Sequence, residues 1–440
     1  MGTFPLRQIF AVKNKLERAY RVHVYRYGDW NERDYRLGVR MVAGTTFIVL
    51  AVVGACVIRA NYLNHEEQSE VAEAQHFLAN GDYAGAVKRA TQAIELNSSD
   101  LQACMVLVNA SSLGHLPTEL YWAQRLAEIA PTTENKLRLA ATGLRCQIAP
   151  FPVTSGVLAH FTDGDTNNPA FQIVAGNFAV ALHQPSDAES HFKTALQLEP
   201  NNQQYALSLA TLQLGLSDPA VQKQARQRLE KLAQDGSVGI TALRVLVADR
   251  QAAGDDLAAE HYSDQLLASP QASMTDRLQN LAILQQADHA KFTDRLHLVM
   301  DLAANQVSTM AELSSWMQAN GLAQENVDWL GSLPRNIRSE QAYKLALAQG
   351  YLQLGKWQDV LDFANRDNWF DQDFLRLALV SRAWSQLGVP TVAQSDWGEA
   401  VKKAGDHYEA MTNLLVLAQH WQMSDAQQDL RQRILQVAPQ

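Results

Sequence analysis

The stretch DAESHFKTALQLEPNN, residues 187–202, contains the pattern that decides the fold. Ala188, Phe192, Ala195 and Pro200 stand in it with successive gaps of four, three and five residues. Gaps of four and three place the first three side chains on one face of a helix, and the proline marks where that helix ends. The stretch therefore predicts a helix whose small residues let a second, antiparallel helix pack closely, with one aromatic ring filling the layer.

The same gaps recur at four other places in the chain. They occur at Ala86, Ala90, Ala93 and Ser98, at Glu119, Ala123, Leu126 and Pro131, at Ala258, Tyr262, Gln265 and Pro270, and at Ala393, Trp397, Ala400 and Gly405. A matching first half lies upstream of some copies, as in Gly176, twelve residues before Ala188. The unit that repeats is thus a pair of helices joined by a short turn.

These residues resemble the tetratricopeptide repeat (TPR) family, whose consensus places alanines, an aromatic residue and a terminal proline in this way. Tyr351, Gly355 and Trp357 stand before Val360 as that family would have them. The resemblance implies that the residues pack hairpins together: Ala86, Ala90, Ala93, Ala188, Phe192, Ala195, Pro200, Ala258, Tyr262, Pro270, Tyr351, Trp357, Ala393, Trp397 and Ala400. It also implies a superhelix whose concave face, lined mainly by first helices, accepts a peptide or a partner helix.

The spacing of the copies extends the pattern to most of the chain. Second-helix anchors fall at positions 86, 119, 188, 258, 360, 393 and 426, separated by 33 residues or by values close to multiples of 34. Degenerate units are expected near 153, 223, 292 and 326. The sequence therefore predicts an all-α solenoid of about eleven helix pairs over residues 66–440.

Two stretches break this rhythm. Residues 148–169 contain three prolines and the sequence DGDTN, which begins like a calcium-binding loop. Asn168 stands where that loop needs glycine and Val174 where it needs a bidentate glutamate, so no metal site is expected. Residues 320–338, with two glycines and Pro334, are expected to be a bend or a degenerate unit between arrays at 66–319 and 339–440.

A second feature precedes the repeats. Residues 41–58, MVAGTTFIVLAVVGACVI, carry no charge and are bracketed by Arg40 and Arg59. Eighteen helical residues span roughly 27 Å, enough to cross a thin bilayer. A single transmembrane helix is the favoured interpretation over a buried soluble helix. A cleaved signal is the other alternative, because 53–56 (VGAC) approximates a lipoprotein-processing box. However, signal peptides usually begin with a short basic region, and here forty residues precede the apolar segment.

Charge predicts the orientation of this span. Residues 1–40 hold nine Lys/Arg and four acids, which leaves 28 basic and 42 acidic residues for the remainder of a chain with net charge −9. The positive-inside rule then places residues 1–40 in the cytoplasm and the repeats across the inner (plasma) membrane, in the periplasm of a bacterium, after a short stalk at 59–65. An acidic body argues against nucleic acid as a partner.

The basic tail also has a helical pattern. Apolar and aromatic residues recur at helical spacing at Ile9, Val12, Leu16, Ala19, Tyr20, His23 and Tyr27. Such a helix would lie on an anionic leaflet, or would dock on a membrane protein through Tyr20, Tyr27 and Trp30. The third interpretation is a topology signal with incidental amphipathicity.

Catalytic and cofactor chemistry has no sequence signal. Histidines such as His160, His183, His191 and His261 form no metal-ligand spacing, and no nucleophile elbow, dinucleotide fingerprint or phosphate loop is present. We therefore expect no enzyme, no cofactor and no small-molecule substrate. Cys104 and Cys146 are expected as buried free thiols, with a disulfide between them as the alternative.

Tryptophan is concentrated at the C-terminal end, where seven of nine residues lie. Trp357, Trp384 and Trp397 occupy packing positions of the repeat, so a core role is favoured for them. Trp369 and Phe370 are less easily assigned, since hairpin packing is favoured for them but exposed rings would mark an interface. Arg335, Arg338 and Lys344 are expected on the solvated surface, where they would face an acidic partner if one binds.

The combination predicts a membrane-anchored scaffold or adaptor that displays a TPR solenoid outside the cytoplasm to hold a protein complex of the cell envelope. Its layout of tail, span and repeats is similar to that of inner-membrane TPR proteins that accompany the protein-translocation channel. Two alternatives stay open at this point. One is a structural subunit of a large membrane complex, and the other is a lipoprotein-like regulator of an envelope polysaccharide or cell-wall enzyme.

Overall fold

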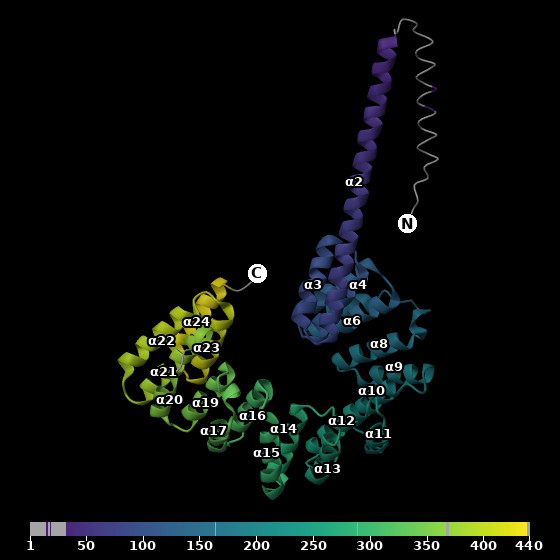
Figure 1. Ribbon diagram of the computed structural model, residues 1–440. Helices are drawn as coiled ribbons and strands as arrows, with labels where there is room; N and C mark the ends of the chain where they lie inside the picture. The colour runs from purple at the N-terminus through teal and green to yellow at the C-terminus, as the bar shows by residue number, and fades with distance from the viewer. Residues whose placement is uncertain are drawn as a thin grey trace. The chain divides into compact units, whose positions relative to one another are not determined.

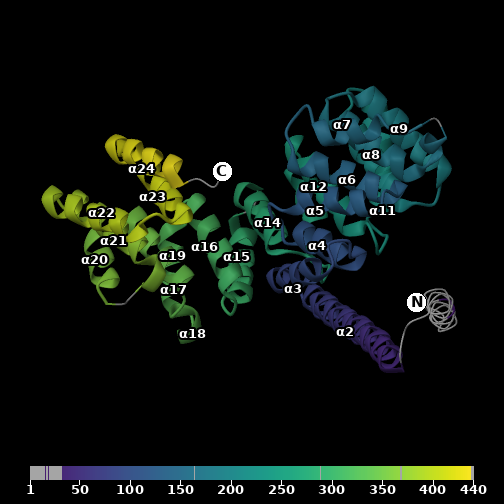
Figure 2. The same cartoon turned by 90° about the horizontal axis from the view of Figure 1, so that it is seen from above.

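The chain folds into helical hairpins. The computed structural model describes Lys15, Arg18 and residues 32–162, 164–287, 289–366 and 369–437, and within these residues it contains helices and no strand (Figures 1 and 2). The chain divides into two compact units, residues 1–198 and 199–440. Tyr20, Tyr27, Trp30 and the rest of the predicted tail helix, apart from Lys15 and Arg18, lie outside the described residues.

The first unit contains four hairpins in the part of it that is described. Successive helices pack on one another from α2 to α7, and α8, which also contacts α6, packs on α9. The helices are α2 (Glu32–Ala79), α3 (Tyr83–Leu96), α4 (Leu101–Leu113), α5 (Glu119–Ile129), α6 (Thr133–Cys146), α7 (Pro152–Leu158), α8 (Pro169–Ala181) and α9 (Pro185–Leu198), with a 3-10 turn, η1 (Asp165–Asn167), before α8.

Helix α2 joins the apolar segment to the first hairpin without a break. It runs for 48 residues, and its C-terminal part packs against α3 and α4 while its N-terminal part extends away from the hairpins (Figure 1). The helix from residue 42 onward contains a window of mean hydropathy 2.1, none of which is buried, so it is long and apolar enough to cross a membrane. Residues 59–65, expected as a stalk, are part of the same helix.

The second unit contains seven hairpins within its described residues. Its helices are α10 (Gln203–Leu214), α11 (Pro219–Leu232), α12 (Gly239–Ala252), α13 (Asp256–Leu267), α14 (Met274–Ala287), α15 (His289–Ala303), α16 (Val307–Ala319), α17 (Ala323–Ser332), α18 (Arg335–Arg338), α19 (Gln341–Gln353), α20 (Trp357–Ala364), α21 (Asp373–Gln386), α22 (Pro390–Ala404), α23 (Tyr408–His420) and α24 (Ser424–Val437), with a 3-10 turn, η2 (Phe370–Gln372), before α21. Over both units the described helices make eleven pairs, which confirms the predicted all-α repeat architecture.

The degenerate units keep the spacing of the clear ones. In α11 the buried face is Ala225, Leu229 and Leu232, and in α15 it is Phe292, Leu296 and Val299, again with gaps of four and three. Leu232 in α11, and Phe292 and Val299 in α15, stand where the clear copies have alanine. The helical face is thus preserved while the small residues that make the pattern visible in the sequence are lost.

One predicted register is shifted. In α13 the buried side chains are Ala259, Ser263 and Leu266, whereas Ala258 and Tyr262 are only half-buried. The packing face therefore begins at Ala259 and not at Ala258. The sequence could not choose between two adjacent alanines, because both fit the small position.

A residue in the left-handed region closes many of the hairpin turns. Gly355 has φ 68° and Gly388 has φ 80°, while His115, His183 and Gln422 adopt φ 50° to 58° at the corresponding turns. Glycine adopts this region without the steric cost that a Cβ atom brings. Positions 321, 355, 388 and 422 are thus one structural position seen in four successive repeats.

The segment at 320–338 is a repeat with an added turn. Helix α17 supplies Val327 and Leu330, and α18 follows it with Ile337, all buried in one hydrophobic cluster with Leu281 and Leu347. The core thus continues through this segment. Lys344 is 6% exposed and not on the solvated surface, which corrects that expectation, while Arg335 and Arg338 are exposed.

The two described cysteines are free thiols in different surroundings. Cys104 is fully buried between α4 and α5, whereas Cys146 is exposed at the end of α6. The expectation of two buried thiols is therefore wrong for Cys146. Its Sγ lies 3.7 Å from Oε2 of Glu119, and Glu119 also pairs with Arg145.

Candidate protein-binding groove

The second unit has a groove formed by four successive first helices. Its volume is about 590 Å³, and its walls come from the C-terminal halves of α16, α19, α21 and α23 and from the start of α20. The lining residues are Gln318, Ala319, Gln349, Leu352, Gln353, Trp357, Leu379, Arg382, Val416, Leu417, His420 and Trp421. A groove shared by several repeats suits an extended segment better than a compact small molecule.

The walls of the groove are mainly apolar. Leu352, Val416 and Leu417 lie along it, and Val416 is 56% exposed although it is aliphatic. Trp357 and Trp421 add two half-buried indole rings. Aliphatic and aromatic surface that faces a hollow is what a partner's apolar side chains would cover.

One guanidinium lies among these apolar walls. The Cζ atom of Arg382 is 5.8 Å from the ring centroid of Trp421, over the ring. Trp421 in turn meets Trp397 edge to face, with ring centroids 6.4 Å apart. The two rings fix each other, and the cation–π contact then holds the Arg382 side chain inside the groove.

Amide side chains bind neighbouring repeats together at the groove floor. Gln353 donates from Nε2 to the carbonyl oxygen of Gln318 at 2.9 Å, and Gln318 donates to that of Ala346 at 3.1 Å. Both bonds join α16 to α19, the first helices of two successive repeats. The spacing of the walls is thereby set by side chains about one repeat apart in the sequence.

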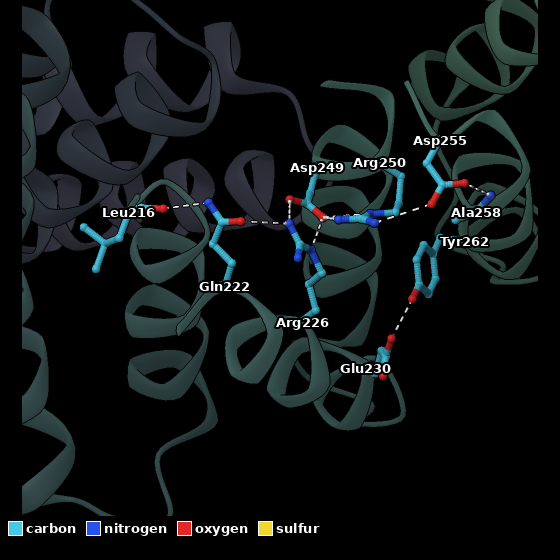
Figure 3. Close-up of polar contacts among 9 residues, drawn as sticks. All are labelled: Leu216, Gln222, Arg226, Glu230, Asp249, Arg250, Asp255, Ala258 and Tyr262. Carbon is cyan, nitrogen blue, oxygen red and sulfur yellow. Dashed lines mark hydrogen bonds and ion pairs between the residues drawn. The ribbon is translucent and has the colours of Figure 1, made fainter. Parts of the chain in front are cut away.

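A network of ion pairs and hydrogen bonds also joins neighbouring hairpins at α11, α12 and α13 (Figure 3). Asp249 accepts from Arg226 at 2.8 Å and from Arg250 at 2.5 Å, and Arg250 reaches Asp255 at 3.4 Å. The Tyr262 hydroxyl donates to Glu230 at 2.7 Å. Figure 3 shows Arg226, Asp249, Arg250 and Asp255 as one connected series and Tyr262 with Glu230 as a separate pair beside it. The network therefore joins the hairpins, with each carboxylate paired to a donor.

The pKa values of this network fit a structural role. Burial alone would raise the pKa of Asp249, but the hydrogen bonds from Arg226 and Arg250 outweigh burial and hold it below its ordinary value. Burial and the Glu230 carboxylate raise the pKa of Tyr262 to about 12. Near neutral pH the carboxylate is charged and the phenol is neutral, so neither group is poised to exchange a proton.

A bidentate pair links two first helices in the same unit. Arg244 of α12 donates to both carboxylate oxygens of Asp276 in α14, each at 2.9 Å. Ser273 adds bonds from its backbone N–H and its hydroxyl at 2.8 and 2.9 Å. Burial raises the pKa of Asp276, yet Arg244 and Ser273 together bring it below the usual value. These two helices belong to consecutive repeats, so the pair fixes how they stack.

The histidines considered from the sequence have local structural contacts. His183 occupies a left-handed turn position, and Nδ1 of His191 lies 2.6 Å from Oε1 of Gln172 on the facing helix α8. Burial lowers the pKa of His191. Nε2 of His261 lies 2.7 Å from Nε2 of Gln265, one turn along α13. Among the described residues, no group of three or more His, Cys, Asp or Glu side chains is placed to hold a metal ion.

Most predicted packing residues lie where hairpins meet. Fully or almost fully buried are Ala86, Ala90, Ala93, Ala188, Phe192, Ala195, Ala393 and Ala400. Half-buried are Ala258, Tyr262, Tyr351, Trp357 and Trp397, while Pro200 and Pro270 are exposed just after α9 and α13 end. The prolines thus stand at helix ends, as their chemistry requires.

The repeats are tetratricopeptide-type hairpins. The observation that decides this is the pairing of short helices in which buried residues with gaps of four and three recur about every 34 residues, within both units. No protein-family model matches the chain, and no curated protein matches it.

Matches among the solved structures include the following three proteins. For pilF of Pseudomonas aeruginosa the identity is 18%, the match covers 51% of this chain and 99% of that one, and the TM-score is 0.33. For the Cut9–Hcn1 hetero-tetramer of the APC/C the identity is 11%, the match covers 86% of this chain and 80% of that one, and the TM-score is 0.29. For the human IFIT1 dimer with m7Gppp-AAAA the identity is 12%, the match covers 76% of this chain and 89% of that one, and the TM-score is 0.33. These likenesses concern the fold, and no function is taken from them.

The aromatic pair at 369–370 is split by the structure. Trp369 is fully buried with Val360 and Leu379 in one cluster and meets Phe363 edge to face at 6.4 Å. Phe370, with φ 45°, is 70% exposed. Trp369 therefore belongs to the hairpin core, and Phe370 lies at the surface.

Sequence reasoning missed most of the groove. The sequence predicted Trp357 as a packing residue, marked Trp421 only as a member of the tryptophan-rich end, and did not single out Arg382. A signal does exist, since Gln349, Arg382 and Val416 follow one another at intervals of 33 and 34 residues on first helices. Aligning the first helices by repeat, as was done for the second helices, would have brought these three positions together.

Proposed function

We propose that this protein is a membrane-anchored scaffold that binds a segment of a protein partner in the groove of its second unit. The groove is the observation that carries this function. It crosses four repeats, its walls are apolar, and Val416 and Leu417 are presented toward it. Val416, at 56% exposure, forms a contiguous apolar surface with Leu417 and two tryptophans, and such a surface marks an interaction site.

The long helix α2 supports the anchoring part of the proposal. Its apolar window is not covered by other parts of the chain, and a lipid bilayer is the environment that would cover it. Tyr62, one turn beyond the apolar segment, is 66% exposed and would lie at the lipid–water interface, where tyrosine is enriched. The anchor would therefore hold the first hairpin next to the membrane surface.

The charge distribution supports one orientation of this anchor. Basic residues precede the span and an acidic body follows it, so the N-terminus would stay in the cytoplasm and the repeats would lie outside it. In a bacterial inner membrane the partner would then be a periplasmic protein or a subunit of a membrane complex. The repeats would present the groove to that partner at the cell envelope.

Topology and assembly can be tested together. A reporter active only outside the cytoplasm, fused after residue 440, should be active, and purification in mild detergent after chemical crosslinking should recover the same partner repeatedly. Reporter activity confined to the cytoplasm would contradict the orientation. Recovery of the uncomplexed monomer in several detergents would contradict the scaffold role.

A further inference from the structure

We propose that the groove recognises a partner segment in which a side-chain carboxylate is flanked by aliphatic residues, and that Arg382 binds this carboxylate. This inference rests on the proposed function and adds the chemistry of the occupant. Three observations on the groove support the inference. Arg382 has no carboxylate partner among the described residues, the groove lining contains no Asp or Glu, and apolar side chains lie on either side of Arg382.

Arg382 has no carboxylate partner among the described residues. Its guanidinium makes a cation–π contact with the Trp421 ring. Most other partly buried arginines of the unit are paired, as Arg226 is with Asp249, Arg250 with Asp255 and Arg376 with Asp373. Among the described residues Arg277 is an exception, and it lies on α14, outside the groove. A half-buried guanidinium without an anion is unusual in an acidic protein, so its position calls for an anion from outside the chain.

The contact with Trp421 leaves the donors of Arg382 available. A guanidinium that lies over an aromatic ring makes that contact with its flat face, while its five N–H groups point outward in its own plane. Two of these N–H groups form a fork that matches the two oxygens of a carboxylate. The tryptophan thus positions Arg382 without using the groups that would bind an acid.

The lining of the groove favours an acidic occupant. None of its twelve residues is an Asp or Glu, although the chain as a whole carries net charge −9. The C-terminal ends of α19 and α23 do add negative character, about half a charge each. Backbone N–H groups cap these ends, as those of Leu354 and Trp421 do, which weakens that effect. Arg382 is the one Lys or Arg side chain of the lining, and no acidic side chain of the lining offsets it.

The neighbours of Arg382 define the flanking residues. Leu352 lies on α19, in the repeat before that of Arg382, and Val416 and Leu417 lie on α23, in the repeat after it. These side chains offer hydrophobic contact and no hydrogen-bonding groups, so aliphatic side chains before and after the acid would gain most from burial there. An internal Asp or Glu between such residues fits this arrangement.

A selection experiment tests the inference with the full-length protein in lipid nanodiscs. Random heptapeptides are displayed on phage through their C-terminal ends, so they carry no free terminal carboxylate and only an Asp or Glu side chain can supply one. Peptides eluted from the wild-type protein should be enriched in one Asp or Glu with Leu, Ile or Val beside it. A synthetic copy of a selected peptide and its Gln analogue then serve as probes for affinity.

Four variants make the outcome decisive. Arg382→Gln should weaken the acidic peptide by about tenfold or more, as expected for loss of a charged bidentate hydrogen bond, and should not weaken the Gln analogue further. Arg382→Lys should retain part of the affinity. Arg431→Gln, which removes the same charge from an exposed position on α24, should leave it unchanged. Val416→Glu should abolish binding of every groove peptide.

Each contrary result has a distinct meaning. Peptides that lose binding in Val416→Glu but show no acidic enrichment, or that bind Arg382→Gln normally, would overturn the carboxylate inference and leave the groove function intact. A selection that yields no peptide sensitive to Val416→Glu would overturn the proposed function itself. Amide exchange of α19–α23 in each variant verifies that the groove is folded.

Discussion

At the scale of single residues, the buried carboxylate of Asp276 is the clearest test of the inter-repeat contacts. Asp276→Asn keeps the size of the side chain but removes the charge that Arg244 and Ser273 bind. We expect a loss of about 1–3 kcal/mol in local stability, because the polar donors around it stay buried with a poorer acceptor. Hydrogen exchange of α12 and α14 amides measures this locally, which suits a repeat array.

The pH dependence of that effect has a definite sign. The pKa of Asp276 is lowered in the folded chain, so its contribution is fully present above the unfolded pKa of about 4 and is lost as the pH falls through the folded value. Wild type and Asp276→Asn should therefore differ by a constant amount from about pH 5 to 8 and converge in acid. Asp429→Asn breaks an exposed pair with Arg433 and should cost well under about 1 kcal/mol. Equal losses in both variants would contradict the account.

Close packing of the hairpin α8–α9 gives a second residue-scale prediction. A Cβ added to Gly176 would lie 2.4 Å from Cε1 of Phe192, which is 2% exposed. Gly176→Ala should therefore destabilise the first unit by about 1–3 kcal/mol, as overpacking does. The thermal midpoint of the variant measures the change. In the control Gly156→Ala, where no atom lies within 4 Å of the new Cβ, the midpoint should stay or rise.

The residue types that mark a repeat in the sequence are those that pack backbones together. Ala188, Phe192 and Ala195 were recognisable because small residues and one ring stand at fixed gaps, and all three are buried. The adjacent alanines at 258 and 259 satisfy the same rule twice, so only the tertiary packing selects Ala259. Trp369 and Phe370 are neighbouring large aromatic residues, and only the tertiary structure separates them: Trp369 is buried, while Phe370, in the left-handed region, is exposed.

At the scale of elements, the continuity of α2 leads to the next prediction. Residues 59–65 are helical and join the apolar segment to the first hairpin. In lipid nanodiscs their amides should exchange slowly, at rates close to those of the helix on either side. Asn61→Pro should raise exchange there, because proline removes one hydrogen bond and clashes with the preceding turn. Rapid exchange of 59–65 in the wild-type chain would show a flexible stalk instead.

Elements were more predictable than the surfaces between them. Helix pairs follow from a spacing that recurs along the chain, and even α11 and α15 retain it with larger apolar residues at some of the alanine positions. The groove has no such local signal. Arg382 reaches Trp421 through the fold and across 39 positions of the sequence, so its role depends on how two first helices stack.

At the scale of the whole molecule, the protein combines an exposed apolar helix with a hairpin array that carries the proposed partner-binding groove. The anchor follows from length and composition, and the groove follows from the stacking of α16, α19, α21 and α23. The two features lie in different units of the chain. Each can therefore be altered without changing the other, which allows the binding function to be tested in the membrane-bound protein.

The most direct test is site-specific photocrosslinking in living cells. A photoreactive benzoylphenylalanine in place of Val416, in the groove, should yield one discrete adduct with a partner protein. The same residue in place of Leu298, 59% exposed on α15 and outside the groove, serves as the matched control and should yield none. The account predicts an adduct at Val416 that Arg382→Gln weakens. Identical products at the two positions, or no adduct at Val416 with the protein folded and in the membrane, would contradict it.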